Sequence, residues 1–198
     1  MDGIVLMIDE HKKIKRMLDV IRKVCMDIMN GAEIEFKDFE NIIDFVRNYA
    51  DKHHHGKEEK FLFTKMVDEI GGAAEKLVKF GMLVEHDFGR MYIRDLEEAL
   101  EKYKSGNEEA KLDIVANAVS YANLLFRHID REDNVAYSFA KRELCKDTLS
   151  KIDIECEEFE IEAHKEGLQD RYIKVLEMLE KKYNEVSVSY THLTLPTT

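Results

Sequence analysis

The sequence predicts an all-α protein: an up-down-up-down four-helix bundle followed by an additional C-terminal helix. Three observations support this fold. The only proline among the 198 residues is Pro196, so nearly the whole chain is free to form helices. Charged residues make up 36% and hydrophobic residues 44%, a balance typical of amphipathic helices. Long segments also repeat buried-type residues every three or four positions, which is the spacing of one helix face.

The predicted bundle helices span residues 3–30, 35–67, 73–104 and 108–140. In the first two, the buried-type positions are Ile4, Met7, His11, Ile14, Leu18, Ile21, Cys25 and Ile28, then Phe36, Phe39, Ile43, Val46, Ala50, His54, Glu58 and Phe61. In the last two, they are Met82, His86, Gly89, Ile93, Leu96, Leu100 and Tyr103, then Ile114, Ala118, Tyr121, Leu125, His128, Glu132, Val135 and Phe139. The connections are short and contain turn residues at 30–31, 71–72 and 105–107, which favours antiparallel neighbours.

Beyond the bundle domain, 1–143, we expect a second segment, 144–184, and a tail, 185–198. An amphipathic helix is predicted over 153–183, where it either packs on the bundle or forms a homodimer contact. Its apolar face is predicted to contain Ile161, His164, Leu168, Tyr172, Val175 and Leu179. The tail is rich in Ser, Thr and Val and resembles a non-native or disordered segment, so none of its residues is a candidate for the functional site.

Composition argues against several classes of partner. A formal net charge of −11 disfavours binding to nucleic acid or to an anionic membrane. The three cysteines, Cys25, Cys145 and Cys156, form no CxxC pair, which suggests reduced thiols. Neither a signal peptide nor a run of transmembrane length is visible. We therefore expect a cytoplasmic protein.

A His-x-x-x-Glu motif occurs twice, as His54 with Glu58 and as His128 with Glu132. Residues four apart on a helix lie on the same face, so each motif directs one imidazole and one carboxylate to one point. A single histidine precedes each motif at nearly equal spacing: His11 by 54 − 11 = 43 residues and His86 by 128 − 86 = 42 residues. The chain therefore resembles one helix pair used twice.

These six ionisable residues all occupy positions that the apolar pattern assigns to the core. Burying such groups is costly, by several kcal/mol per ion, unless they are paired or bind metal. At about 1.5 Å per residue, all six lie about 12 to 20 Å from the same end of the bundle. One layer of four imidazoles and two carboxylates suits iron, zinc or manganese, and each carboxylate can bridge two cations. Without a thiolate, a structural zinc site is disfavoured.

These motifs resemble those of the hemerythrin-like, or HHE cation-binding, proteins. The matching stretches are DEH at 9–11, HHGKEEKFLF at 54–63, EHD at 85–87 and HIDRE at 128–132. The resemblance implies a non-haem di-iron centre, with zinc or manganese less favoured. It implies that Glu58 and Glu132 bridge the two irons, and that the terminal ligands are His11, His54, His86 and His128.

Oxygen-carrying hemerythrins have a fifth histidine, as His-x-x-x-His on the third helix, but here Arg90 stands four residues after His86. His164 is one candidate for this ligand, against a structural role in the core. His55 and Glu59 form a rival pair four residues apart, and a register shift of one residue would make them the ligands. The apolar pattern and the family motif both favour His54 with Glu58, and His53 is expected on the surface.

The resemblance implies a protein that binds or senses oxygen or a similar small diatomic, with no catalytic residue assigned. The alternative is a di-iron enzyme that acts on peroxide or nitric oxide, or that repairs iron–sulfur clusters. Repair proteins carry an N-terminal cysteine pair, which this sequence lacks. A ferritin-like oxidase would need Glu-x-x-His motifs, and a histidine phosphotransfer bundle would need one exposed histidine. Whether the protein is an enzyme stays open, and a binding role is favoured.

Overall fold

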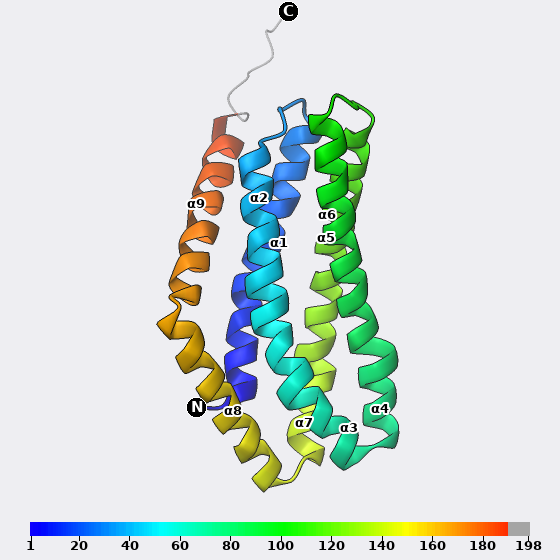
Figure 1. Cartoon of the computed structure of the whole chain (residues 1–198), viewed down its shortest axis with the longest axis vertical. Coiled ribbons are helices and arrows are strands. Elements are labelled where there is room, and N and C mark those ends of the chain that lie inside the picture. The colour runs from blue at the N-terminus through cyan, green and yellow to red at the C-terminus, as the bar shows by residue number, and fades with distance from the viewer. Residues whose placement is uncertain (190–198) are drawn as a thin grey trace, which may run out of the picture.

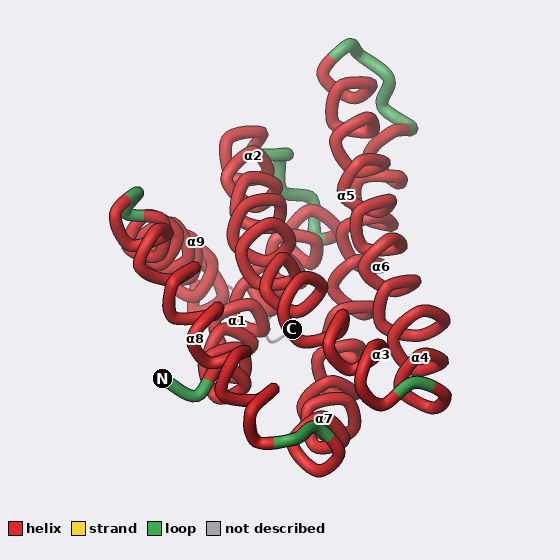
Figure 2. Tube along the Cα trace, turned by 60° about the horizontal axis from the view of Figure 1, so that its bottom comes forward, coloured by secondary structure: helices red, strands yellow, loops and turns green. Residues whose placement is uncertain are grey.

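The computed structural model describes the backbone of residues 1–189 and the side chains of residues 1–184. The described chain consists of helices and the loops that join them, as the sequence predicts (Figure 2). Four long helical segments run side by side, and a C-terminal pair of helices lies along one flank (Figure 1). None of the described helices has the length and apolar character needed to cross a bilayer.

The first bundle helix is α1 (Gly3–Met29), whose start is capped by the Asp2 carboxylate accepting from the Val5 amide. The second runs through α2 (Phe36–Phe45), η1 (Val46–His55), η2 (Glu58–Phe63) and α3 (Thr64–Ile70). The third comprises α4 (Gly72–Leu77), η3 (Val78–Met82) and α5 (Leu83–Lys104). The fourth comprises α6 (Ala110–Arg131), η4 (Glu132–Ala136) and α7 (Tyr137–Glu143).

The elements named η are π-helical: their backbone hydrogen bonds span five residues instead of four, as from the Gly56 amide to the Asp51 carbonyl. A π turn contains more residues than an α turn, so the positions that face the core after it differ from those that a regular α-helix would bury. Val135, predicted in the core, is 50% exposed for this reason. Ala136 at the end of η4, with Tyr137 and Ala140 in α7, is buried in its place.

The turns between the bundle helices lie where the sequence predicts them. Gly31, Gly71, Gly72 and Gly106 all adopt positive φ, between 35° and 100°, a region that L residues with a side chain rarely adopt. These tight reversals keep sequential helices antiparallel. All four helices therefore cross the same level of the bundle.

The C-terminal segment differs from the single helix predicted over 153–183. It forms α8 (Lys146–Lys165) and α9 (Leu168–Ser189), separated at Gly167, whose φ is 63°. The break changes the buried face: Ile161 and His164, both predicted to be buried, are exposed, whereas Ile152, Cys156 and Glu160 are buried. Helix α9 packs against α1 and α2. Most of the predicted tail, from residue 190 on, lies outside the described residues.

Two apolar clusters fill the bundle. The larger includes Ile14, Ala50, Ile93 and Leu125, and the smaller includes Met7, Leu62, Met82 and Ala136. On each bundle helix, the predicted ligands fall between residues of the two clusters. The fold thus confines the ionisable side chains to one polar layer that is closed by apolar packing above and below.

Candidate metal centre

The structure buries all six predicted ligands in this polar layer, each with 1% or less of its surface exposed. Four of them form a first group, in which each residue offers a ligand-type atom within 4.8 Å of the others. The members of this group are His11, His54, Glu58 and Glu132. The Nε2 atom of His11 lies 3.3 Å from Oε2 of Glu132, and Nε2 of His54 lies 3.6 Å from Oε2 of Glu58.

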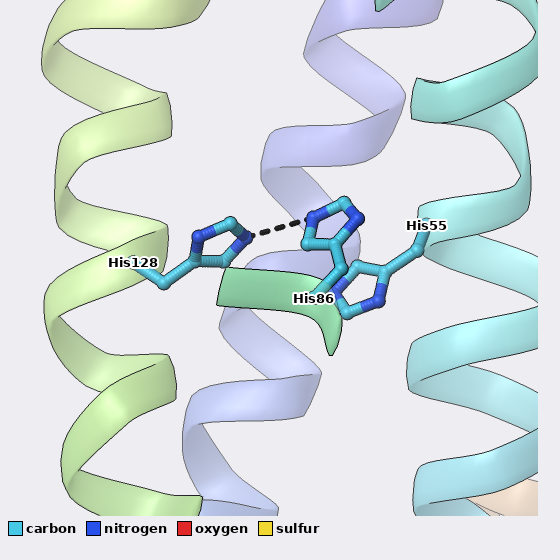
Figure 3. A group of neighbouring side chains, drawn as sticks. All are labelled: His55, His86 and His128. Carbon is cyan, nitrogen blue, oxygen red and sulfur yellow. Dashed lines mark hydrogen bonds between the residues drawn. The ribbon is translucent and has the colours of Figure 1, made fainter. Parts of the chain in front are cut away.

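A second group contains three histidines, His55, His86 and His128, which meet the same distance criterion. Figure 3 shows them pointing toward one another from η1, α5 and α6. The rings of His55 and His86 stack with centroids 3.7 Å apart, and Nε2 of His86 lies 3.0 Å from Nε2 of His128. The sequence motifs predict His86 and His128 in the site, whereas His55 beside them is found in the structure.

The two glutamates lie between the groups. Glu132 directs Oε2 toward His11 in the first group and Oε1 toward His128 in the second, at 3.0 Å. Oε2 of Glu58 lies 3.6 Å from His54 and 3.7 Å from His86. Both carboxylates therefore face donors of both groups, which is the arrangement needed to share two cations.

All five histidines of the two groups are oriented in the same way. In each, Nδ1 contacts a carboxylate at 2.7 to 3.2 Å, which leaves Nε2 free to face the layer. The pairs are His11–Asp133, His54–Glu10, His55–Asp51, His86–Glu59 and His128–Glu85. Metal-binding histidines typically have such a carboxylate partner, which fixes the ring and makes it a better donor. His55 shares this feature with the four predicted histidines.

Several atoms of the layer lack a hydrogen-bond partner among the described residues. They are Nε2 of His54, Oε2 of Glu58 and both carboxylate oxygens of Glu132. Buried polar atoms are rarely left without a partner, since desolvating them costs about 1–3 kcal/mol each. These unpaired atoms all belong to residues of the first ligand group, so they fit bound cations.

The protonation of the buried side chains in the layer also fits the binding of cations. Burial and the nearby Glu132 carboxylate raise the pKa of Glu58 well above its usual range. Burial opposes charge on His128, but Glu132, Glu85 and Glu58 together outweigh it and raise the pKa of His128 to about 10. Burial and the charge of His11 lower the pKa of His54 to about 4. Without metal, protons on Glu58 and His128 therefore offset the negative charge that cations would neutralise.

Tyr137 closes the first group on one side. Its hydroxyl donates to Oε1 of Glu58 at 2.5 Å, and its ring stacks on His11 with an interplanar angle of 4°. The phenol is buried with the ligands, and burial together with the Glu58 carboxylate raises its pKa well above the usual value. The first group is therefore enclosed by side chains.

The second group borders a cavity of about 110 Å³. Its lining includes His55, His86, Gly89, Ile93 and Tyr121. Arg90, which stands at the position of the expected fifth histidine, lines the same cavity and is 40% exposed at its side chain. Its guanidinium donates to Asp51 and Glu59, each at 2.7 Å, and these are the carboxylates that orient His55 and His86.

Two expectations about the histidines are wrong. His53 is buried, not on the surface, because the π-helical η1 turns three consecutive histidines inward. His164 is exposed on α8, so it is not a core residue, and it belongs to neither ligand group. His55 from η1 instead brings the number of histidines facing the layer to five.

A helical bundle with a buried layer of histidines and shared glutamates defines a class of metal-binding proteins. The model of the hemerythrin HHE cation-binding domain matches residues 2–140. Since this match covers more than half of the chain, the protein belongs to that family, as its motifs indicate. A search of curated proteins found no match.

Proposed function

We propose that the layer holds two iron ions and that the protein binds or senses oxygen or a similar small diatomic. In this proposal, His11 and His54 bind one ion, and His55, His86 and His128 bind the other. Glu58 and Glu132 are shared between the two ions. The observation that carries the proposal is the arrangement of these seven buried side chains as two groups with two carboxylates between them.

The donor set supports iron. Imidazole and carboxylate ligands suit iron, zinc and manganese, whereas neither group contains the thiolates common in structural zinc sites. A pair of iron ions would supply the electrons with which a diatomic ligand is reversibly bound. The chain itself orients the five imidazoles through their carboxylates and keeps bulk water out of the layer.

The cavity limits what the site can accept. Pockets for drug-sized ligands typically enclose about 300–1,000 Å³. The cavity beside His55 and His86 encloses only about 110 Å³, so it accommodates a molecule of a few atoms. Size therefore supports a diatomic, peroxide or a small anion, and argues against an organic substrate.

The second candidate function is a di-iron enzyme acting on peroxide or nitric oxide. The Tyr137 phenol favours it, because its hydroxyl oxygen lies 2.5 Å from Oε1 of Glu58, a carboxylate shared between the two groups. A phenol at this distance can deliver a proton to the centre, which a pure carrier does not need.

The test is anaerobic reconstitution with Fe(II), followed by metal counting and by visible spectroscopy as air is admitted and removed. Two irons per chain and a reversible absorption band would support binding or sensing. Irreversible oxidation with turnover of peroxide would favour the enzyme. Only trace iron after reconstitution would contradict both functions. A Glu132→Ala variant, treated in the same way, controls for iron bound elsewhere on the acidic surface.

A further inference from the structure

A second buried cluster lies behind His54, on the side away from the layer. Glu10, whose Oε2 contacts Nδ1 of His54, directs its other oxygen toward the ammonium of Lys57. Lys57 also contacts Glu160 of α8, and Nε2 of His53 lies 3.1 Å from both carboxylates. A chain of contacts thus runs from a candidate ligand to the C-terminal helices.

Lys57 has none of its surface exposed, which is unusual for a lysine. A buried ammonium is costly unless it is paired, and here it lies between two carboxylates. Glu160 is itself held in place, since its other oxygen accepts from Gln169 near the start of α9. The position of the ammonium is therefore set from both sides.

The other four histidines lack this arrangement. Their carboxylates pair with cations that are 34–48% exposed: Lys15 for Asp133, Arg90 for Asp51 and Glu59, and Arg131 for Glu85. Solvent screens those pairs. Glu10 alone is fully buried with its cation. This pair is completed by a residue beyond position 140, where the match to the cation-binding domain ends.

We propose that Glu160 is a positioning residue of the metal centre, acting on His54 through Lys57 and Glu10. Glu160 shares the Lys57 ammonium, so Glu10 keeps enough negative charge to hold the Nδ1 proton of His54 strongly. A strongly held proton makes Nε2 a better electron donor. The C-terminal helices thereby contribute to metal affinity although they contain none of the ligands.

This inference rests on the proposed function only in that His54 binds a metal ion; it does not depend on which gas binds. Removing the charge of Glu160 leaves Lys57 paired chiefly with Glu10. Glu10 then pulls less on His54, and the ion of the first group is held more weakly. Changes to partners of metal-binding histidines typically lower metal affinity about 10–100-fold. Because Glu160 acts through two further residues, we expect the lower end of this range.

The test compares Glu160→Gln with Glu158→Gln, a change of the same kind at an exposed position on the same helix. Iron-loaded full-length proteins are mixed anaerobically with a chelator, and the rate of metal loss is followed. Loss from Glu160→Gln should be about tenfold faster, with the control unchanged. Thermal unfolding of the metal-free proteins measures the purely structural effect separately.

A double variant, Lys57→Met with Glu160→Gln, removes both charges and leaves Glu10 in contact with His53 through one oxygen and with His54 through the other. It should retain metal nearly as well as the wild type, which a purely structural role for Glu160 does not predict. Normal metal retention by Glu160→Gln, with a lower unfolding temperature alone, would overturn the inference while leaving the proposed function intact. A wild-type protein that binds no iron would overturn both.

Discussion

The two groups of the polar layer differ in how they are enclosed. The first group is backed by Tyr137 and by the buried Glu10–Lys57 pair, and none of its members lines the cavity of the second group. The second group borders a cavity of about 110 Å³, and its orienting carboxylates Asp51 and Glu59 are 30% exposed. The comparison suggests a division of roles, in which the first ion is held fast and the second meets the ligand.

The largest expected effect is that of Glu132→Ala, which removes the carboxylate facing both groups. Metal affinity should fall by at least about 100-fold, because the change removes a ligand and leaves the two cations with Glu58 as their one shared carboxylate among the proposed ligands. Metal counting after desalting measures the loss. Asp130→Ala is the matched control, since Asp130 is exposed on the same helix. Equal loss from both variants would contradict the assignment.

Acid should weaken metal binding. Without metal, Glu58 and His128, whose pKa is raised to about 10, hold protons that an incoming cation must displace. Pairing of protonated His128 with Glu132 stabilises the metal-free fold fully below pH 6.5 and is lost as pH rises through about 10. Affinity should therefore rise with pH, by about tenfold per unit for each proton released. Chelator competition from pH 6 to 8 would measure this slope, and a flat profile would oppose the prediction.

His55→Ala tests the newly found member of the second group. The variant should lose the ion of that group and keep the ion of the first, with affinity for the lost ion lower by about 10–100-fold. Iron counts near one per chain would show this selectivity. His164→Ala removes an exposed histidine and should leave the count unchanged. Two tightly bound irons in His55→Ala would show that His55 is not a ligand.

Gly89→Leu tests the cavity as the route to the second group. A leucine side chain at this lining position fills the cavity without removing a donor. Azide binding to the iron-loaded protein should slow by at least about fivefold, equivalent to roughly 1 kcal/mol in the barrier. Gly81→Leu is the control, because a side chain there meets open space. Unchanged azide kinetics in Gly89→Leu would argue for another route.

Tyr137→Phe, which removes the hydroxyl that donates to Glu58, should change stability and leave metal content and ligand access unchanged. Loss of one buried hydrogen bond should cost about 1–3 kcal/mol in the free energy of unfolding. Both ions should remain bound, and the visible spectrum of the iron-loaded protein should shift. Loss of an ion from the variant would contradict this prediction and show that the Tyr137 hydroxyl is needed for metal binding by the first group.

The spacing of apolar residues was enough to predict the four bundle helices and their turns. The same spacing also placed the six ionisable residues in the core, because residues three and four apart lie on one face of a helix. It failed where the backbone departs from α-helical geometry. His53, His55 and Val135 lie in or after π turns, and sequence spacing carries no sign of such turns. One signal for His55 was present: Asp51 precedes it by four residues, as expected for a carboxylate that orients a histidine.

The C-terminal segment was predicted less well for a related reason. Gly167 interrupts a pattern that otherwise looks continuous, so the buried face of α8 could not be inferred from that of α9. Glu160 and Lys57 were missed because each resembles an ordinary surface residue until its partner is known. Long-range pairing of this kind depends on how α8 docks, and spacing within one helix does not encode it.

The π turns also have a consequence for how the protein folds. They lie in three of the four bundle helices, at or next to the polar layer, whereas α1 is continuous. Backbone hydrogen bonds in such turns have poorer geometry than α-helical ones, so amide hydrogens in this middle region should exchange with solvent faster than those of the apolar ends. Bound ions would tie the same turns together across the bundle. Metal loading should therefore slow amide exchange most in the middle of the molecule, where exchange is expected to be fastest without metal.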